Sequence, residues 1–485
     1  MAKITVDPIT RLEGHGKIEI FLDDNGNVKE AYLQVPELRG FEKFCEGRKA
    51  EDMPQLTSRI CGVCPVAHHF ASTKALDMAF GVEPTETAKK LRELIYCGYI
   101  IYDHILHFYF LAGPDFIVGP DAPKEKRNVI GVIEKVGSEL ASEVIKHRAY
   151  GQKMTEILGG KPTHPVCGVP GGVTKNLSES ERQEIYRMAQ SCYNFALKTL
   201  DLFHKFVLED PRYLSFIMDP AHTLKVYNMG LVDDKNRVNF YDGLIRVTDQ
   251  NGNEFLRFHP KDYLNYIAEE VIEWSYIKVP YLKTIGFKGF VDGSDSGLYR
   301  VGPLARLNAA DGMATPRAQE EYELMYKTFQ TKPVNNTLAY HWARLIELVY
   351  ASERAIELVS QPDITDTNIR NMNYQFHETG IGVVEAARGT LFHHYELTQD
   401  YLIKKVNLIV ATTNNAGVLN LSVKNAAKTI LKNSSQISEK LLNTIEMFYR
   451  AYDPCMACAS HNIGSLNLIV NIYNNTNNLI DSRQV

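Results

Sequence analysis

The sequence predicts a mainly helical α+β protein with a large helical core, a central helix bundle and small antiparallel sheets at the periphery. Two observations lead to this class. Long segments repeat apolar residues at three- and four-residue steps, which is the period of an amphipathic helix. Shorter segments alternate apolar and polar residues around an Asn-Gly pair, which is typical of a β-hairpin.

Two hairpins are expected, one near the N-terminus and one in the middle of the chain. Residues 16–35, GKIEIFLDDNGNVKEAYLQV, place apolar residues at every second position around Asn25-Gly26. Residues 238–258, VNFYDGLIRVTDQNGNEFLRF, suggest a second hairpin with Asn251-Gly252 at its turn. An Asn-Gly pair accepts the positive φ angles that a two-residue hairpin turn requires.

Helical periods dominate the rest of the chain. A Ser-x-x-Glu pattern at Ser178 and Glu181 predicts a capped helix start. The strongest helical segments are PTETAKKLRELIYCGYIIYDHILHFYFL (84–111), SESERQEIYRMAQSCYNFALKTLDLFHKFVL (178–208), NNTLAYHWARLIELVYASERAIELV (335–359) and SEKLLNTIEMFYRAY (438–452).

Composition bounds the function classes. The 485 residues are 45% hydrophobic and 23% charged, as in an ordinary globular protein. The net charge of −5 argues against a general nucleic-acid binder, because phosphate binding needs a basic surface. No signal-peptide pattern is evident, and the longest apolar patch is interrupted by Gly113, Pro114 and Asp115, short of a membrane span. We therefore expect a cytoplasmic protein without a membrane span.

Two cysteine pairs lie near opposite ends of the chain. RICGVCPVAH contains Cys61 and Cys64, and DPCMACASH contains Cys455 and Cys458. Each pair is expected at the start of a helix, where a thiolate is favoured; Asp453 would cap the second one. The pairs can be unrelated structural cysteines, a four-cysteine zinc site, or two halves of one catalytic metal centre. A four-cysteine zinc site usually has its two pairs about 15–20 residues apart, far closer than the two pairs lie in this chain. Thiolates also select nickel, iron or copper, which suits a catalytic metal centre.

The residues around the cysteines resemble the signature pair of the [NiFe]-hydrogenase large subunit. The resemblance extends over almost the whole chain and its blocks come in the family's order. It is similar above all to the cytoplasmic, methyl-viologen-reducing methanogen type that serves heterodisulfide reductase. The further blocks are DPITRLEGHGKIEI, RGFEKFCEGR, YDHILHFYFL, GGKPTHPVCGVPGGV, YRVGPLARLN and EAARGTLFHHY.

The resemblance implies the metal ligands. Cys61 and Cys455 would be terminal ligands of a nickel ion, while Cys64 and Cys458 would bridge nickel to an iron. The iron would carry one carbon monoxide and two cyanides. Four thiolates bring about four negative charges, so the surroundings should supply hydrogen bonds and positive charge.

Four further residues match the surroundings of the family's centre. His68, one helical turn after Cys64, would donate a hydrogen bond to a bridging sulfur. Arg388 would face the open metal position, held by Asp103 and Asp453. The chain departs from the family at Ala387, where proline is frequent, and in VATTNN, where the family usually has a Pro-Thr-Thr-Trp-Asn block.

Two glutamates carry the remaining expectations. Glu13, in TRLEGH, matches the residue that takes the proton from the terminal cysteine, which a carboxylate can do if burial raises its pKa. Glu42, in RGFE, matches a ligand of a structural magnesium or similar hard cation, together with His461. Each glutamate, taken alone, would be read as an exposed charge.

The reaction implied is the reversible, heterolytic splitting of dihydrogen, with Glu13, Arg388 and Cys455 as catalytic residues. Cys45, Cys97, Cys167 and Cys192 are scattered singly and offer no site for an iron–sulfur cluster. We therefore expect an iron–sulfur partner subunit, with onward transfer to a heterodisulfide reductase or ferredoxin system. The alternatives are a deazaflavin-coenzyme- or NAD(P)-reducing hydrogenase subunit, or a structural zinc protein that acts in protein interactions.

The predicted organisation is one unit, residues 1–461, followed by an extension. The unit would comprise a β-hairpin region at 1–40, a helical core at 50–235 and 310–461, and a β-containing insert at 236–305. The resemblance implies that residues 462–485 are removed by a maturation protease after the metals are loaded.

Overall fold

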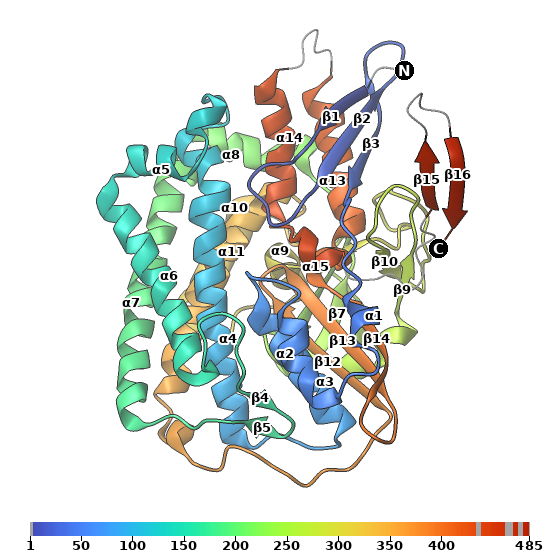
Figure 1. Ribbon diagram of the computed structural model, residues 1–485. Coiled ribbons are helices and arrows are strands. Elements are labelled where there is room, and N and C mark those ends of the chain that lie inside the picture. Colours follow the sequence, from blue (N-terminus) through green and yellow to red (C-terminus); the bar gives the residue numbers. More distant parts are fainter. Residues whose placement is uncertain (1–2, 433–437, 461–468, 474–478, 485) are drawn as a thin grey trace.

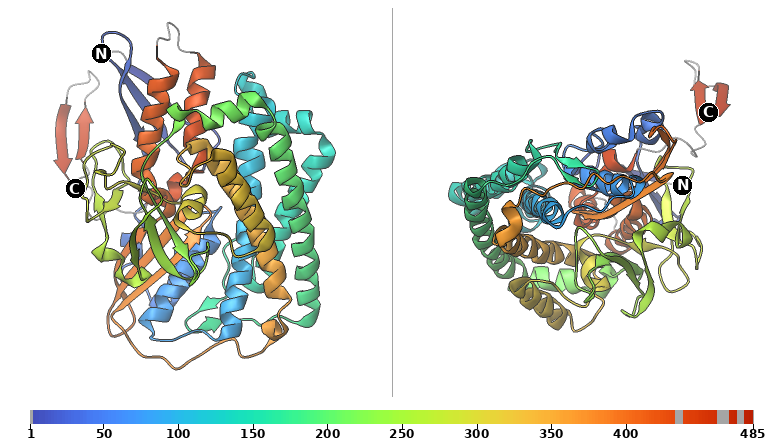
Figure 2. Two further views of the ribbon diagram at one scale, coloured as in Figure 1. Left: turned by 180° about the vertical axis from the view of Figure 1, so that it is seen from behind. Right: turned by 90° about the horizontal axis from the view of Figure 1, so that it is seen from below.

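The computed structural model describes residues 3–432, 438–460, 469–473 and 479–484. Long helices stand side by side on one flank, while the sheets and shorter helices form the other flank (Figure 1). The views from behind and from below show the same division (Figure 2). One apolar core runs through both flanks. The predicted class, mainly helical with a bundle and small sheets, is confirmed.

The bundle is formed by four long helices that pack against one another. Ser178 and Glu181 form the predicted capping box, in which the serine hydroxyl accepts the Glu181 N–H and the glutamate accepts the Ser178 N–H. A Cβ on Gly151 would lie 2.8 Å from the carbonyl oxygen of Gly98, so glycine lets α4 and α6 approach closely. The bundle helices are α4 (Glu86–Leu106), α6 (Ser138–Gly159), α7 (Glu179–Phe203) and α11 (Tyr340–Val359).

Helix α4 continues beyond the point where the sequence suggested a break. π-Helical turns follow it, at η2 (His107–Ala112) and η3 (Pro114–Val118). Asp115 does not interrupt the helix, because its buried carboxylate pairs with Arg11 at 2.6 Å and Arg450 at 2.9 Å. Within the described residues, Glu86–Val118 is long and apolar enough to cross a membrane, yet 83% of its most apolar window is buried inside the fold.

Helix α3 (Pro65–Ala79) lies directly on a sheet with the strand order β12-β13-β14. A Cβ on Gly382 would lie 1.9 Å from the carbonyl oxygen of Ala71, so only glycine permits this approach. The contact places the start of α3 beside the body of the sheet. The strands are β12 (Thr379–Ala386), β13 (Gly389–Leu397) and β14 (Ile403–Ile409), all antiparallel.

The N-terminal strands form an antiparallel sheet beside α13 (Ala416–Ile430) and α14 (Glu439–Ala451) (Figure 1). Its hairpin turns at Asn25-Gly26, where Gly26 has a φ of 81°, as the sequence predicted. The Asn251-Gly252 hairpin is also confirmed, with a φ of 86° at Gly252. The N-terminal strands are β1 (Lys3–Val6), β2 (Lys17–Leu22) and β3 (Val28–Gln34).

Other strands form a sheet in the order β11-β6-β7-β8 and small antiparallel pairs. They are β4 (Gly168–Val169), β5 (Gly172–Val173), β6 (Tyr227–Val232), β7 (Leu244–Thr248), β8 (Glu254–Phe258), β9 (Ile267–Glu270), β10 (Val279–Leu282) and β11 (Tyr299–Arg300). The remaining α-helices are α1 (Phe41–Cys45), α2 (Met53–Ser58), α5 (Val129–Val136), α8 (Pro211–Met218), α9 (Pro303–Ala309), α10 (Pro316–Phe329), α12 (Ala411–Asn414) and α15 (Met456–Ala459). Short helical turns are η1 (Ala50–Asp52), η4 (Lys124–Lys126), η5 (His204–Leu208), η6 (Pro220–His222), η7 (Pro260–Asn265), η8 (Thr337–Ala339) and η9 (Pro362–Thr365).

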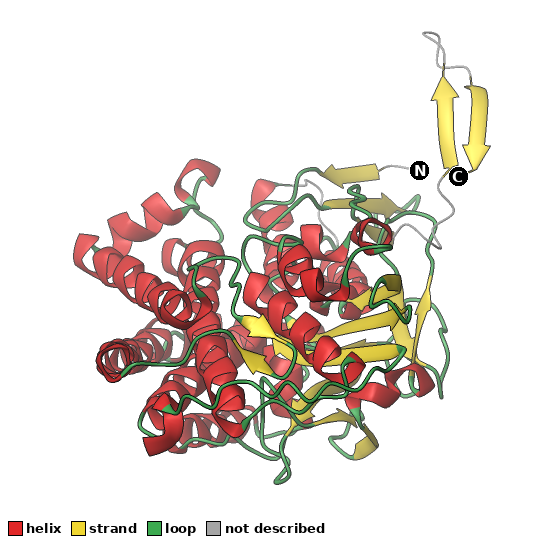
Figure 3. Ribbon diagram, turned by 60° about the horizontal axis from the view of Figure 1, so that its bottom comes forward, coloured by secondary structure: helices red, strands yellow, loops and turns green. Residues whose placement is uncertain are grey.

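The described part of the C-terminal extension is a hairpin of β15 (Ile469–Tyr473) and β16 (Leu479–Gln484). It stands away from the body of the molecule (Figure 3). His461 lies outside the described residues. The division into one unit ending at residue 461 and a removable extension stays a prediction.

Candidate metal centre

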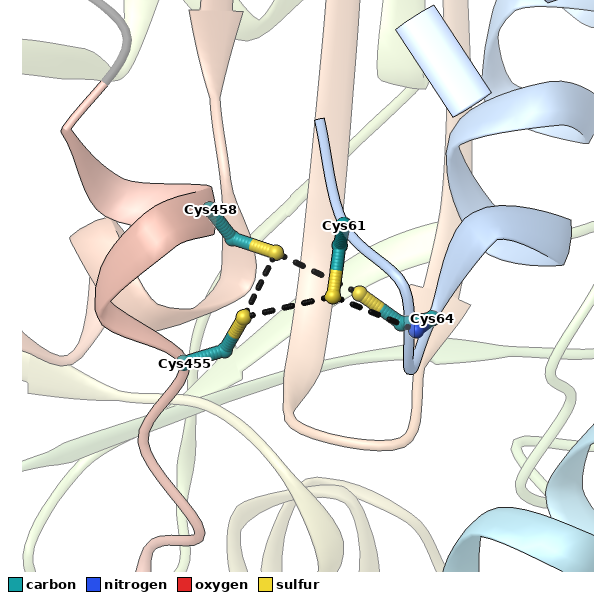
Figure 4. Close-up of side chains that lie close together, drawn as sticks. All are labelled: Cys61, Cys64, Cys455 and Cys458. Atoms are coloured by element: carbon teal, nitrogen blue, oxygen red, sulfur yellow. Dashed lines mark hydrogen bonds between the residues drawn. The ribbon is translucent and has the colours of Figure 1, made fainter. Parts of the chain in front are cut away.

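The two cysteine pairs meet in the interior. Cys61 and Cys64 precede α3, whereas Cys455 and Cys458 lie at the short helix α15 (Figure 4). The four sulfur atoms lie within 4.8 Å of one another. Cys61 Sγ is 3.5 Å from Cys455 Sγ, Cys64 Sγ is 3.4 Å from Cys458 Sγ, and Cys455 Sγ is 2.7 Å from Cys458 Sγ. All four side chains are buried and none of them forms a disulfide.

The structure shows what joins the two ends, which sequence reasoning had missed. Arg39 Nη1 donates to the carbonyl oxygens of Ile60 and, at 3.1 Å, Ala457. The backbone N–H of Arg39 donates to the Ser460 carbonyl at 2.6 Å. Arg39 therefore binds both the residue before the first cysteine pair and a residue between the two cysteines of the second pair. Its place in the RGFEKFCEGR block was the signal available in the sequence.

Both pairs lie at helix starts, but the second helix begins later than predicted. Cys64 is the residue before α3, and Cys455 is the residue before α15. Asp453 was expected to cap that helix and to hold Arg388. It does not cap the helix, since it has a φ of 55°, but its carboxylate does pair with Arg388. The Cys455 N–H donates to the hydroxyl of Thr412 at 3.0 Å, a contact that sequence reasoning did not foresee.

The sulfur cluster is suited to soft metal ions. The Cys455 hydrogen bond, followed by those of Cys458 and Cys64, holds the pKa of Cys61 well below its ordinary value, so one thiolate forms readily. Burial raises the pKa of Cys455 and Cys458, so their thiols ionise only when positive charge arrives. Metal–sulfur bonds of about 2.3 Å place sulfurs around one ion roughly 3.8 Å apart. The distances of 3.5 Å and 3.4 Å are close to this value, whereas the 2.7 Å between Cys455 and Cys458 is shorter. The buried thiolate donors fit soft metal ions such as nickel and iron.

Glu13 reaches the cluster from the N-terminal region. Its Oε2 accepts the Cys455 thiol at 2.9 Å and the Ala457 N–H at 3.1 Å. The backbone carbonyl of Glu13 also accepts the Met456 N–H at 2.9 Å. Burial, followed by the charge of Cys61, raises the pKa of Glu13. The carboxyl group is thereby placed to exchange a proton with a cysteine sulfur.

Arg388 lies between two buried carboxylates. Its Nη1 is 3.2 Å from Asp103 Oδ2 and its Nη2 is 2.9 Å from Asp453 Oδ2. Burial lowers the pKa of Arg388, but Asp103 and Asp453 more than offset this, so the guanidinium stays charged. Burial raises the pKa of Asp453 to about 7. Arg388 therefore places a fixed positive charge in the interior, held by two acidic side chains.

The two departures from the family pattern are accommodated by local hydrogen bonds. Ala387 has an N–H that proline lacks, and the Tyr99 hydroxyl accepts it at 3.0 Å. Asn414, in the VATTNN block, donates to the Thr390 carbonyl at 2.7 Å and accepts the Tyr299 hydroxyl. Both positions are therefore fixed within the core.

Two further predicted residues, His68 and Glu42, are also buried. His68 is fully buried on α3, and its Nδ1 lies 3.1 Å from Nε2 of His393. Glu42 is buried on α1, and its Oε1 accepts the Leu408 N–H at 2.7 Å. Burial raises the pKa of Glu42 to about 7. A buried carboxylate of this kind favours a proton or a cation beside it.

Comparison with known proteins identifies the family. A family model described as nickel-dependent hydrogenase matches residues 39–136 and 266–461. The chain belongs to the nickel-dependent hydrogenase family. A second model, described as HoxL-like, matches residues 3–38. The four clustered cysteines thus lie in the segments that match a nickel enzyme.

Full-length relatives show the same membership. An F420-non-reducing hydrogenase iron-sulfur subunit of Archaeoglobus profundus is 47% identical, with 99% of each chain covered. An F420-non-reducing hydrogenase subunit of Methanothermobacter marburgensis is 40% identical over 96% of each chain. The NAD-reducing hydrogenase HoxS subunit beta of Cupriavidus necator is 37% identical over 99% of each. These names describe subunits of larger enzymes.

Solved structures share the fold of this nickel-dependent hydrogenase. A structure of NAD+-reducing [NiFe]-hydrogenase in the H2-reduced state has a TM-score of 0.89 and 39% identity, covering 95% of this chain and 100% of that chain. The Ni-Fe-Se hydrogenase from D. vulgaris Hildenborough has a TM-score of 0.75 at 23% identity, with the same coverage, and supports the fold alone.

Proposed function

We propose that the chain is the catalytic subunit of a [NiFe]-hydrogenase that splits dihydrogen reversibly and heterolytically. The observation that carries the proposal is the buried cluster of four cysteine sulfurs, assembled from both ends of the chain. Glu13 lies against one of these sulfurs, and Arg388 supplies charge nearby. The combination offers a soft metal site, a proton acceptor and a fixed cation.

The cysteines would hold both metals. Cys61 and Cys455 would bind nickel alone, while Cys64 and Cys458 would bind nickel and iron, with one carbon monoxide and two cyanides completing the iron. When bound, the metals would act as Lewis acids that make dihydrogen acidic enough to lose a proton. His68 would donate a hydrogen bond to a bridging sulfur, because it follows Cys64 by one turn of α3.

Glu13 would move the proton. Its Oε2 lies within hydrogen-bond distance of Cys455 Sγ, and its raised pKa favours uptake of the proton by the carboxylate. The neighbouring Ala457 N–H keeps that oxygen in place. The Cys455 thiolate would serve as the base that first receives the proton; the Arg388 side chain, the alternative base, stays protonated because its pKa is raised.

Arg388 would face the open metal position as a permanent cation. A guanidinium presents several donors in a rigid plane, which suits cyanide nitrogens and polarised dihydrogen. Asp103 and Asp453 fix its orientation through separate nitrogens. The side chain would therefore enter the reaction already aligned.

Glu42 and His461 would hold a magnesium or similar hard cation. The burial and raised pKa of the Glu42 carboxyl support this, because a divalent cation would stabilise its ionised form. His461 lies outside the described residues, so its role rests on the family resemblance.

Electrons would leave through a small iron–sulfur partner subunit. Within the described residues, Cys45, Cys97, Cys167 and Cys192 are buried and lie outside the four-cysteine cluster. The family resemblance implies a cytoplasmic complex in which a further electron-transfer subunit passes electrons to a heterodisulfide reductase or ferredoxin system. Relatives named F420-non-reducing hydrogenase support an acceptor other than coenzyme F420. An NAD(P) acceptor is the second candidate, supported by the relative and the structure named as NAD-reducing. Identifying the subunits that copurify with the chain separates the two.

Residues 462–485 would be removed by a maturation protease that cuts after His461 once the metals are in place. Ser460 is buried and its carbonyl accepts the Arg39 N–H, so the chain is held inside the protein up to the residue before the proposed cut.

Metal analysis with infrared spectroscopy tests the proposed centre. We expect nickel near one atom per chain and bands of metal-bound carbon monoxide and cyanide. Zinc in place of nickel, without these bands, would instead identify a structural zinc protein.

A further inference from the structure

A group of charged side chains holds the segment that carries Glu13. Arg11 lies two residues before Glu13, and its guanidinium donates to the carboxylate of Asp115 at 2.6 Å. The same guanidinium donates to the Leu111 carbonyl at 2.9 Å and to the side-chain oxygen of Asn443 at 3.1 Å. A guanidinium suits this place because its donors form a rigid fork that can serve several acceptors at once.

Asp115 also binds the helix that leads to the second cysteine pair. Arg450, near the end of α14, donates to both carboxylate oxygens of Asp115, at 2.9 Å and 3.1 Å. Cys455 follows a few residues later in the chain. One carboxylate thus binds an arginine from the segment that carries Glu13 and another from the segment that carries Cys455. Both residues of the proposed proton step are therefore tied to Asp115.

The charges of this group balance only while Arg11 is present. Arg450 Nη1 donates to Glu446 Oε2 at 2.6 Å, and the same oxygen accepts the N–H and the hydroxyl of Thr10. Two arginines thus face two carboxylates, and Asp115, Arg450 and Glu446 are buried. Burial raises the pKa of Asp115, but the charges of Arg450 and Arg11 more than offset this, so the carboxylate stays ionised. Without Arg11, the buried group would carry an excess negative charge.

The backbone of Arg11 has a conformation that glycine would adopt more easily. Its φ is 56°, in the left-handed region that residues with a side chain seldom occupy. Such a conformation persists where the surrounding contacts hold it in place, and it is frequent at functional sites. The backbone alone would favour glycine here, so the contacts of the guanidinium explain why the chain has an arginine.

We propose that Arg11 is a positioning residue that, through Asp115, holds the Glu13 carboxyl against Cys455. The inference rests on the proposed function, because it concerns the proton step at that sulfur. Glu13 Oε2 lies 2.9 Å from Cys455 Sγ. A misplacement of about 1 Å in such a contact can cost on the order of 10²-fold in rate. Arg11 would act on this distance through the short segment that joins it to Glu13.

Arg11→Gly tests the proposal, because glycine keeps the left-handed backbone and removes only the guanidinium. In the purified enzyme with its partner subunit, nickel content and the carbon monoxide and cyanide bands should stay at wild-type levels. Dihydrogen uptake per nickel should fall about 10- to 100-fold. The ratio of uptake in H2O to uptake in D2O should rise, because proton transfer would then limit the rate. A loss of folded protein alone would not change this ratio.

Free guanidinium provides a second measurement on the same variant. Arg11, Asn443 and Glu446 line a surface cleft of about 310 Å³, so the space left by the deleted side chain is reachable from solvent. Guanidinium chloride at millimolar concentration should restore uptake several-fold in Arg11→Gly, because the cation replaces the lost partner of Asp115. Urea has a similar planar shape but no charge, so it should not restore uptake.

Arg127→Ala is the matched control. Arg127 lines the same cleft, but its Nε donates at 2.9 Å to the Ala122 carbonyl instead of a carboxylate. Its uptake, its isotope ratio and its response to guanidinium should match those of the wild type. Arg11→Lys keeps the charge without the fork, so we expect an intermediate fall in uptake with a raised isotope ratio.

Unchanged uptake and isotope ratio in Arg11→Gly, or in Arg11→Lys if the glycine variant loads no nickel, overturn the inference and leave the proposed function standing. Equal restoration by urea and by guanidinium, or an equal loss in Arg127→Ala, also overturns it. Absence of both kinds of band from the wild-type protein overturns the proposed function, and the inference falls with it.

Discussion

Cys455 Sγ lies 2.9 Å from Glu13 Oε2, although 442 residues separate them in the chain. The same carboxylate oxygen accepts the Ala457 N–H at 3.1 Å, from a residue between the cysteines of the second pair. The N-terminal region and the C-terminal cysteine loop therefore close on each other at the sulfur cluster. The contact joins the base proposed for proton transfer to the sulfur that it would serve.

Glu13→Gln should stop proton exchange without dismantling the centre. The amide oxygen of glutamine can still accept the Ala457 N–H, but the side chain cannot take up a proton at working pH. Because general acid–base groups contribute about 10²–10⁴-fold, we expect exchange between dihydrogen and water to fall by that factor. Nickel content and the infrared bands should stay at wild-type levels. Full activity in this variant would refute the proton route.

Cys455→Ser should abolish hydrogen uptake and lower the nickel content. Serine offers a hard oxygen in place of a soft thiolate, so the site loses a ligand suited to nickel. Cys192→Ser is the control, because Cys192 is equally buried but lies outside the cluster. Nickel measured by mass spectrometry should fall in the first variant alone. Equal loss in both would mean that burial, rather than ligation, explains the effect.

Arg39→Lys should weaken the link between the two cysteine pairs. Lysine keeps the charge, but it lacks the planar fork that lets one nitrogen of Arg39 reach both the Ile60 and Ala457 carbonyls. Arg39 is itself exposed, but Ile60 and Ala457 are buried, and leaving a buried carbonyl without its partner costs about 1–3 kcal/mol. We expect a lower melting temperature and slower nickel incorporation.

Arg59→Lys, at an exposed position just before the first cysteine pair, is the control and should leave both measurements unchanged. Normal nickel loading in Arg39→Lys would show that the two ends meet without this arginine.

The sequence could predict those features that depend on local signals. The Asn-Gly turns, the capping box at Ser178 and the helix that follows Cys64 all depend on residues within a few positions. The resemblance to the hydrogenase family extended the prediction to residues far apart in the chain, such as Glu13 and Cys455. The sequence therefore indicated the cluster before any geometry was known.

Features that depend on long-range contacts were missed or wrongly predicted. Asp453 has the residue type of a helix cap, but pairing with Arg388 removes its carboxylate from that role. Asp115 interrupts the longest apolar patch of the sequence, but its pairing with Arg11 and Arg450 allows it to lie buried within the helical turns that continue α4. The partners of Asp115 are about a hundred residues or more away in the chain, so no local pattern could reveal them.

Glu42 should make the stability of the metal-free protein depend on pH. Burial raises its pKa from 4.5 to about 7, so the folded state binds more protons than the unfolded state between these values. The contribution of Glu42 to the free energy of unfolding is therefore largest below about pH 4.5. It falls as pH rises toward 7, by on the order of 3 kcal/mol.

Glu42→Gln should remove this part of the pH dependence in denaturant titrations at pH 5 and pH 8. Magnesium added to the wild type should raise the melting temperature more at pH 8 than at pH 5, because the cation binds the ionised carboxylate. Identical slopes for the variant and the wild type would show that Glu42 does not titrate in this range.

The mature subunit should end at His461. Ser460 is buried and its carbonyl accepts the Arg39 N–H at 2.6 Å, so the chain reaches residue 460 inside the protein, whereas the β15–β16 hairpin stands away from the body. If residues 462–485 keep the precursor open for metal loading, intact-mass measurement of active enzyme should show a chain ending at 461. A gene truncated after codon 461 should then give a folded chain with little nickel, because the second cysteine pair closes too early. Active enzyme that retains the full 485 residues would refute the cleavage, and normal nickel in the truncated form would refute the loading role.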